Sequence, residues 1–345
     1  MIRNQNPAQA GELFAGKVHD SFFLNEYGRI ESLRAARYDT GFSVVLVTIE
    51  TADRAKRGGG KGGKTRKKRA GGPARGELIT EVSSVVTESL RSCDVVGLTE
   101  EGSVAAILPE TDYFGALATI KKLRKAVGQL PAVHRDIEAA FSQATYLRDG
   151  HAFEELLGVA EERAFELRDS LRTTLDLDSR LFWEVLAALF ASDSGGPKNS
   201  SFDTGGAVKL PPAFLDRVSE QVVREITRAP HKKGILYLCP RPGAPTGPMA
   251  RLLESAARTK TKVFVVGSGR ERLDWVKDAS TVPLDDPRLD DLFFAFHLGS
   301  EAAYAFMGRE LWGETYSCFH SADDYLVEGL ITKLQEEYQL QEQLG

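Results

Sequence analysis

The stretch that decides the fold is Leu90–Thr111, with the sequence LRSCDVVGLTEEGSVAAILPET. Two short apolar segments, Val95–Leu98 and Val104–Leu108, flank a polar tip that runs from Thr99 to Ser103. Apolar runs joined by a few turn-forming residues that include a glycine are typical of a β-hairpin. The stretch therefore predicts a hairpin that follows the end of a helix.

The bulk properties are those of a globular protein with more than one core. A chain of 345 residues, with 42% hydrophobic and 27% charged residues, predicts two domains. The net charge of −5 disfavours a dedicated nucleic-acid binder. The longest apolar run, Leu181–Ala191, is too short to cross a bilayer, and the first residues do not form a signal peptide. We expect a cytoplasmic protein without membrane contact.

The three cysteines lie far apart, and none has a second cysteine at metal-ligand spacing. They predict reduced, packed thiols, and no metal site is expected. His297 and His320, with Asp323 and Asp324, are interpreted as structural, and Ser321 as a helix N-cap before first-turn acids. The run Gly267-Ser268-Gly269 could present amides to an anion, but it lacks the third glycine of a dinucleotide fingerprint.

The first half of the chain predicts alternating helices and strands. The helix at 19–37 is expected to bury Phe22, Phe23, Tyr27, Ile30 and Leu33, because these recur at three- and four-residue steps. The β-branched run 42–49 predicts a central strand covered on both faces. Further elements are expected after it: helices at 77–90, 112–127 and 153–171, and a strand at 141–147.

Residues 52–75 are rich in glycine, lysine and arginine. Gly58-x-x-x-x-Gly63-Lys64-Thr65 matches the P-loop pattern, but it neither follows a strand directly nor leads into a helix. The favoured interpretation is a flexible basic loop, the one segment through which an anionic partner such as nucleic acid could bind.

The order Arg91-x-x-Asp94, strand, tip, strand ending in Leu108-Pro109, then helix, resembles the core of the GGDEF family of bacterial diguanylate cyclases. The resemblance covers about residues 18–172. Aligned on Leu-Pro, Glu100-Glu101-Gly102-Ser103-Val104 stand where the family carries its signature letters. Thr48 stands where the family has a metal-binding aspartate, and a hydroxyl lacks the charge that a hard cation needs. The resemblance therefore implies a domain with no catalytic residues and no cyclase activity.

The motif that survives is Arg91-x-x-Asp94, which in the family forms an inhibitory site for a cyclic di-GMP dimer. By resemblance, Arg91 would grip a guanine edge or a phosphate, and Asp94 would accept from guanine N–H groups. Lys122 or Arg124 of the next helix could complete the site. In the alternative interpretation, Arg91 caps the helix and pairs with Asp94.

The second half predicts a connecting helix at 176–191, a linker at 192–206 and a second α/β sheet. Helices are expected at 211–228, 249–259, 270–278, 299–309 and 321–344, and strands at 234–239, 262–267, 292–297 and 315–319. The tail resembles the sensory DICT domains that accompany GGDEF proteins. Its apolar stripe is compatible with a homodimer contact.

These patterns predict a lead-in (1–17), a degenerate GGDEF-like domain (18–172), a connecting helix and linker (173–206) and a C-terminal α/β sensory or interaction domain (207–345). The fold class is α/β (α+β), with a GGDEF-like sheet flanked by helices. The function implied is an inactive signalling protein that binds cyclic di-GMP as a regulatory ligand, needs no cofactor and signals to a protein partner. The alternative is a nucleotide-independent scaffold.

Overall fold

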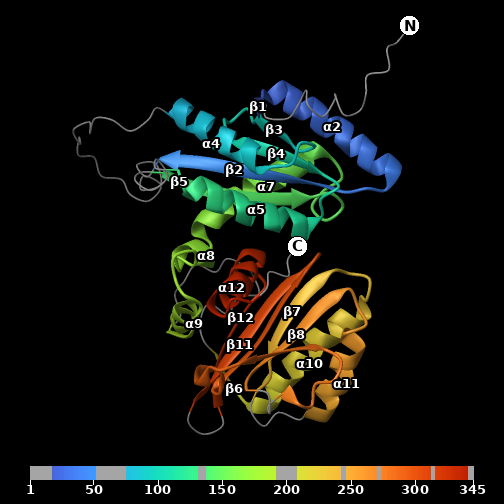
Figure 1. Ribbon diagram of the computed structural model, residues 1–345, viewed down its shortest axis with the longest axis vertical. Helices are drawn as coiled ribbons and strands as arrows, with labels where there is room; N and C mark the ends of the chain where they lie inside the picture. Colours follow the sequence, from blue (N-terminus) through green and yellow to red (C-terminus); the bar gives the residue numbers. More distant parts are fainter. Residues whose placement is uncertain are drawn as a thin grey trace, which may run out of the picture. The chain divides into compact units, whose positions relative to one another are not determined.

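The computed structural model describes residues 18–51, 75–130, 137–191, 208–241, 246–269, 273–311 and 315–340. The lead-in, almost all of the basic loop with its P-loop pattern, and the 192–206 linker lie outside the described residues. Contacts divide the chain into two units, with the boundary between Glu166 and Leu167. The predicted first domain was expected to end at residue 172. The fold class is confirmed, because each unit holds a mixed sheet flanked by helices (Figure 1).

The first unit is built on a five-stranded sheet. Its strands, in spatial order, are β1 (Val18–His19), β3 (Val95–Leu98), β4 (Val104–Pro109), β2 (Phe42–Thr51) and β5 (Ile137–Thr145). The predicted hairpin is β3–β4, and its register pairs Val95 with Ile107 and Leu98 with Val104. Strand β2 is central, as its β-branched sequence predicts, and it runs antiparallel to both β4 and β5.

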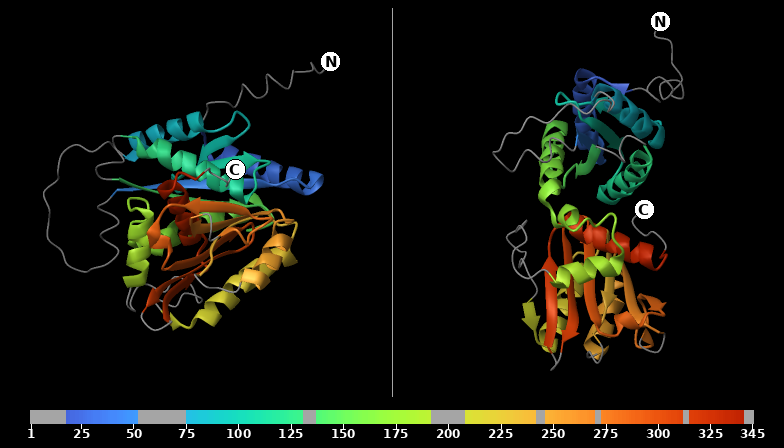
Figure 2. Two further views of the ribbon diagram at one scale, coloured as in Figure 1. Left: turned by 60° about the horizontal axis from the view of Figure 1, so that its bottom comes forward. Right: turned by 90° about the vertical axis from the view of Figure 1, so that its left-hand side faces the viewer.

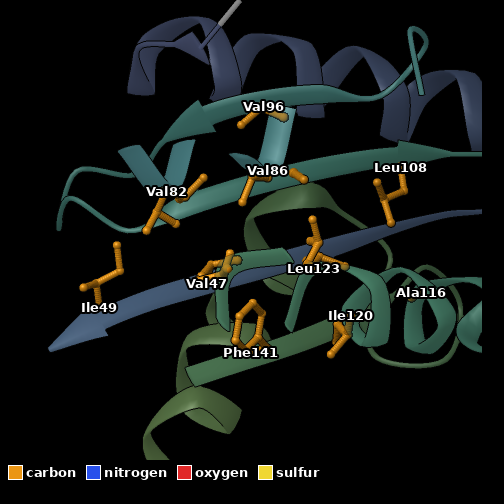
Figure 3. Close-up of a cluster of buried hydrophobic side chains, with 14 of the residues drawn as sticks. Val47, Ile49, Val82, Val86, Val96, Leu108, Ala116, Ile120, Leu123 and Phe141 are labelled. Carbon is orange, nitrogen blue, oxygen red and sulfur yellow. The ribbon is translucent and has the colours of Figure 1, made fainter. Parts of the chain in front are cut away.

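Both faces of this sheet are covered by helices. One face packs against α4 (Arg75–Ser89) and α5 (Tyr113–Gly128), the other against α2 (Ser21–Tyr38) and α7 (Phe153–Asp169). Figure 3 shows side chains of α4 and α5 directed at the sheet, among them Val82, Val86 and Leu123. The alternating residues of β2 enter opposite clusters, Val45 and Val47 on one face and Val44 and Leu46 on the other. The hairpin and the turn before it are thus held on a rigid platform.

The helix at 19–37 forms as α2. Phe23 and Tyr27 of its expected buried face pack against the core, but the expectation is wrong for the other three side chains. Phe22, Ile30 and Leu33 are 75%, 54% and 61% exposed, whereas Leu24, Gly28, Glu31 and Ala35 are buried. The reason is close packing: Gly28 leaves the space that the Phe153 ring occupies. Large side chains on that face would hold the two helices apart.

The second unit contains a seven-stranded sheet with parallel and antiparallel halves. In spatial order its strands are β6 (Val208–Leu210), β12 (Thr315–Ser321), β11 (Ala303–Leu311), β10 (Leu292–Gly299), β7 (Gly234–Cys239), β8 (Thr261–Ser268) and β9 (Ser280–Leu284). Strands β7, β8 and β9 are mutually parallel, and β6 and β10–β12 form an antiparallel meander joined to β7 through β10.

Helices also cover this second sheet on both faces. α10 (Pro212–Arg228) and α11 (Thr246–Ala256) lie on one face, seen clearly in Figures 1 and 2, and share a core with Leu236, Leu238 and Ala295. α9 (Phe182–Ala191) and α12 (Asp324–Glu337) pack on the other. The short helices α8 (Leu171–Thr174) and η2 (Pro287–Leu289) complete the unit. None of the helices in the described ranges is long and apolar enough to cross a membrane.

Three sequence expectations for this unit are wrong. Residues 303–311 form strand β11 rather than a helix, because hairpin pairing with β10 overrides their helix propensity. Residues 273–278, in the described part of the expected helix 270–278, form turns, and the following strand β9 was not predicted. The N-cap of α12 is Asp323, which accepts from the amides of Tyr325 and Leu326, whereas Ser321 ends β12.

A buried ion-pair network joins α8 to α12. Arg172 donates to Glu328 and to Asp178 Oδ1 (2.7 Å). The pair is buried, because only 6% of the Arg172 side chain and 7% of the Glu328 side chain are exposed. Breaking one partner of such a pair leaves a buried charge uncompensated. The network therefore fixes the position of α8 on α12.

Candidate functional site

The hairpin tip is a closed turn. The amide of Thr99 donates to Ser103 O (2.9 Å), and the amide of Gly102 donates to Thr99 O (3.0 Å). Gly102 has a φ of 78°, in the left-handed region that glycine adopts at little cost. Glu100 and Glu101 are exposed at the outer end of the tip. The hairpin tip is thus closed by backbone hydrogen bonds around a single glycine.

Thr48 lies on β2, opposite Ala140 of β5. Its hydroxyl oxygen is buried and has no hydrogen-bond partner among the described residues. A neutral hydroxyl here supplies none of the negative charge with which a carboxylate binds Mg²⁺. The described residues also contain no group of three or more His, Cys, Asp or Glu side chains placed to hold a metal ion.

A carboxyl pair that sequence reasoning missed links the tip to α7. Burial raises the pKa of Glu161, and the nearby charge of Glu101 and a side-chain hydrogen bond with it raise that pKa further. Such a bond between two acids needs a proton on one of them. Glu161 therefore holds a proton more tightly than an isolated glutamate does. The sequence does show the two adjacent glutamates of the tip, Glu100 and Glu101. It gives no sign that α7 lies beside the tip, because the helix is about sixty residues further along the chain.

The Arg91–Asp94 turn connects α4 to β3. The Arg91 amide donates to Asp94 Oδ2 (2.8 Å), the Asp94 amide donates to Arg91 O (3.0 Å), and Arg91 Nε lies 3.6 Å from Asp94 Oδ2. Asp94 is 2% exposed, and its burial raises its pKa even though the hydrogen bonds from Arg91 oppose that rise. Asp94 therefore fixes the backbone and the guanidinium of Arg91, which matches the structural part of the alternative interpretation.

Arg91 itself is presented outward. Its side chain is 60% exposed, and Nη2 donates to Thr111 Oγ1 (2.8 Å). Thr111 is in turn held by a bond from its hydroxyl to Pro109 O (3.0 Å). Nη1 has no hydrogen-bond partner among the described residues. The guanidinium is thus held at Nε and Nη2, and the side chain as a whole is open to solvent.

The structure brings Lys122 to this turn but not Arg124. Lys122 of α5 donates to the carbonyl of Ser89, at the end of α4 and two residues before Arg91. Arg124 lies 5.6 Å from the centroid of the Phe141 ring of β5, at the opposite edge of the sheet from β3. The grouped residues are therefore Arg91, Asp94 and Lys122.

The candidate residues of the second unit do not form one site. His320 packs against the Tyr304 ring (6.1 Å between centroids), Asp323 caps α12, and His297 lies on β10. Ser268 donates to Asp290. Residues 270–272, where a helix would begin after Gly267-Ser268-Gly269, lie outside the described residues.

No protein-family model matches the sequence, and no curated protein matches it significantly. Solved structures that match part of the chain include GGDEF domains and diguanylate cyclases. A diguanylate cyclase protein from Thermotoga maritima is 13% identical, with 43% of this chain and 96% of that chain covered and a TM-score of 0.33. The active GGEEF domain of a Vibrio cholerae diguanylate cyclase is 11% identical (44% and 90% covered, TM-score 0.35). A Caulobacter crescentus GGDEF domain in complex with cyclic di-GMP is 11% identical (48% and 89%, TM-score 0.33).

Proposed function

We propose that this chain is a catalytically inactive GGDEF-like signalling protein that binds cyclic di-GMP at Arg91 and passes the signal to a protein partner. The observation that carries the proposal is the presentation of Arg91, whose guanidinium is 60% exposed and yet fixed by Asp94 and Thr111. A pre-oriented guanidinium suits bidentate recognition of a guanine edge or a phosphate. Lys122 adds a second positive charge beside the turn.

Asp94 takes a different role from the one that the family resemblance implies. Because its carboxylate is buried and already accepts from Arg91, it acts as a positioning residue and not as an acceptor for guanine. Inactivity is supported by Thr48 at the metal position and by the tip residues Glu100 and Glu101. GTP supplied with Mg²⁺ should therefore give no cyclic di-GMP.

A scaffold that binds no nucleotide is the second candidate. The observation that favours it is again Asp94, because a buried carboxylate that accepts from the Arg91 amide is what a purely structural Arg–Asp pair would show. The two functions differ in one respect only: whether Arg91 contacts a ligand.

Cys93 provides a direct test, because it is exposed and lies between Arg91 and Asp94. Cys239 and Cys318 are buried, and burial raises the pKa of Cys318 to about 12, so an alkylating reagent should modify Cys93 first. Saturating cyclic di-GMP should slow this modification in the wild type and leave it unchanged in Arg91→Ala. Equal rates with and without the nucleotide in the wild type would favour the scaffold.

A further inference from the structure

The second unit contains a pocket of about 520 Å³ between α10 and the β10–β11 hairpin. Its walls are mainly apolar, with Val218, Val222 and Ile226 from α10 and Ala303 from β11. A volume of this size falls within the range of small-molecule sites, which spans about 300–1,000 Å³. Every lining residue belongs to the second unit, so nothing that follows depends on the nucleotide proposal.

Among the polar residues of the lining, two stand on neighbouring strands of the sheet. His297 on β10 and Tyr304 on β11 are directly opposite each other in the antiparallel register, so they lie side by side on one face of the sheet. Neither side chain has a hydrogen-bond partner among the described residues. The polar atoms of both side chains are accessible from the pocket, so a ligand that hydrogen-bonds to them can replace the solvent there.

His297 is an uncharged group in this setting. Burial lowers its pKa to about 4, so at neutral pH the imidazole carries one donor nitrogen and one acceptor nitrogen. A neutral imidazole recognises hydroxyl, carbonyl or amide groups and offers no ion pair to a carboxylate or an amine.

The lining of the pocket contains two acidic and two basic side chains, so its charges balance. Lining residues Glu225 and Glu301 are offset by Lys232 and Lys233, and Lys232 pairs directly with Glu301. No excess of either sign is left to attract an ion. The ligand that fits this lining is therefore uncharged.

We propose that this pocket binds an uncharged, largely apolar small molecule with a planar ring and one hydroxyl or carbonyl group. The ring packs between α10 and Tyr304, and the polar group hydrogen-bonds to His297. The second unit is thereby a small-molecule sensor module in its own right.

The probe for the test is 2-naphthol, which has a flat apolar body and one hydroxyl group. Its fluorescence is titrated with the full chain, and naphthalene and 2-naphthoate are used as competitors. We expect saturable binding of 2-naphthol, with naphthalene about fivefold weaker because it lacks one hydrogen bond. We expect 2-naphthoate to be weaker still. No saturable binding, or tighter binding of 2-naphthoate, would overturn the proposal.

Two variants locate the binding. Ala229→Trp fills the pocket from a half-exposed lining position and should abolish 2-naphthol binding, whereas Ala257→Trp, on an exposed position outside the lining, should not. His297→Phe keeps a ring in place and should remove the preference for 2-naphthol over naphthalene. Unchanged binding in Ala229→Trp, with a native melting temperature, would contradict the assignment.

Discussion

At the scale of single residues, Arg91 and Asp94 show how one short motif can hold two roles. The sequence places both residues in the right order, and the resemblance treats them as a pair of ligand contacts. The structure separates them, since Asp94 is buried and accepts from the Arg91 amide while Arg91 is exposed. Burial is a property of the packed turn, and a four-residue spacing carries no information about it.

The Glu101–Glu161 pair leads to a pH prediction. A carboxyl group whose pKa is raised by folding binds its proton more tightly in the folded state, so its contribution lowers stability as the pH rises above its unfolded value. Glu161→Gln removes this contribution and should stabilise the protein at neutral pH by up to about 1 kcal/mol. The gain should vanish at about pH 4, below the ordinary pKa of glutamate.

Thermal unfolding of wild type and Glu161→Gln at both pH values checks this prediction. Glu162→Gln, an exposed neighbour on the same helix, serves as the matched control and should change little. A gain for Glu161→Gln that is equally large at acidic pH would show that the carboxyl pair is not its source.

At the scale of elements, the α2–α7 contact depends on the absence of a side chain. A Cβ on Gly28 would lie 2.2 Å from Cγ of Phe153, at the first residue of α7. Gly28→Ala should therefore destabilise the protein by about 2 kcal/mol or more, because the buried ring has no free space to move into.

The matched control is Gly158→Ala in α7. Gly158 is exposed, and a Cβ there would meet nothing within 4 Å, so the substitution should stabilise the helix by about 0.5–1 kcal/mol. Urea unfolding followed by circular dichroism compares the two variants. The packing account is contradicted if both shift stability in the same direction.

Elements with a strong period or a strong cap were predictable, and those decided by tertiary pairing were not. Strand β2 and helix α5 form where their patterns place them. The sequence of strand β11 favours a helix because alanine and methionine are helix formers, and pairing with β10 and β12 makes it a strand. The buried face of α2 was misjudged because hydrophobicity ranks phenylalanine and isoleucine above the glycine that close packing required.

At the scale of the whole molecule, two α/β units with different candidate ligands lie on one chain. The sequence could indicate both sheets, because strand–helix alternation is a local signal. It could not reveal the pocket that His297 lines, because the walls of that pocket come from α10, β10 and β11, which lie far apart in the sequence.

The most direct test of the central claim is calorimetric titration of the full chain with cyclic di-GMP. We predict micromolar or tighter binding for the wild type and its loss in Arg91→Ala. Arg29→Ala, which removes another exposed arginine of the first unit, should bind like the wild type. No heat and no thermal shift with saturating nucleotide, or equal binding by Arg91→Ala, would contradict the account and leave the first unit as a scaffold.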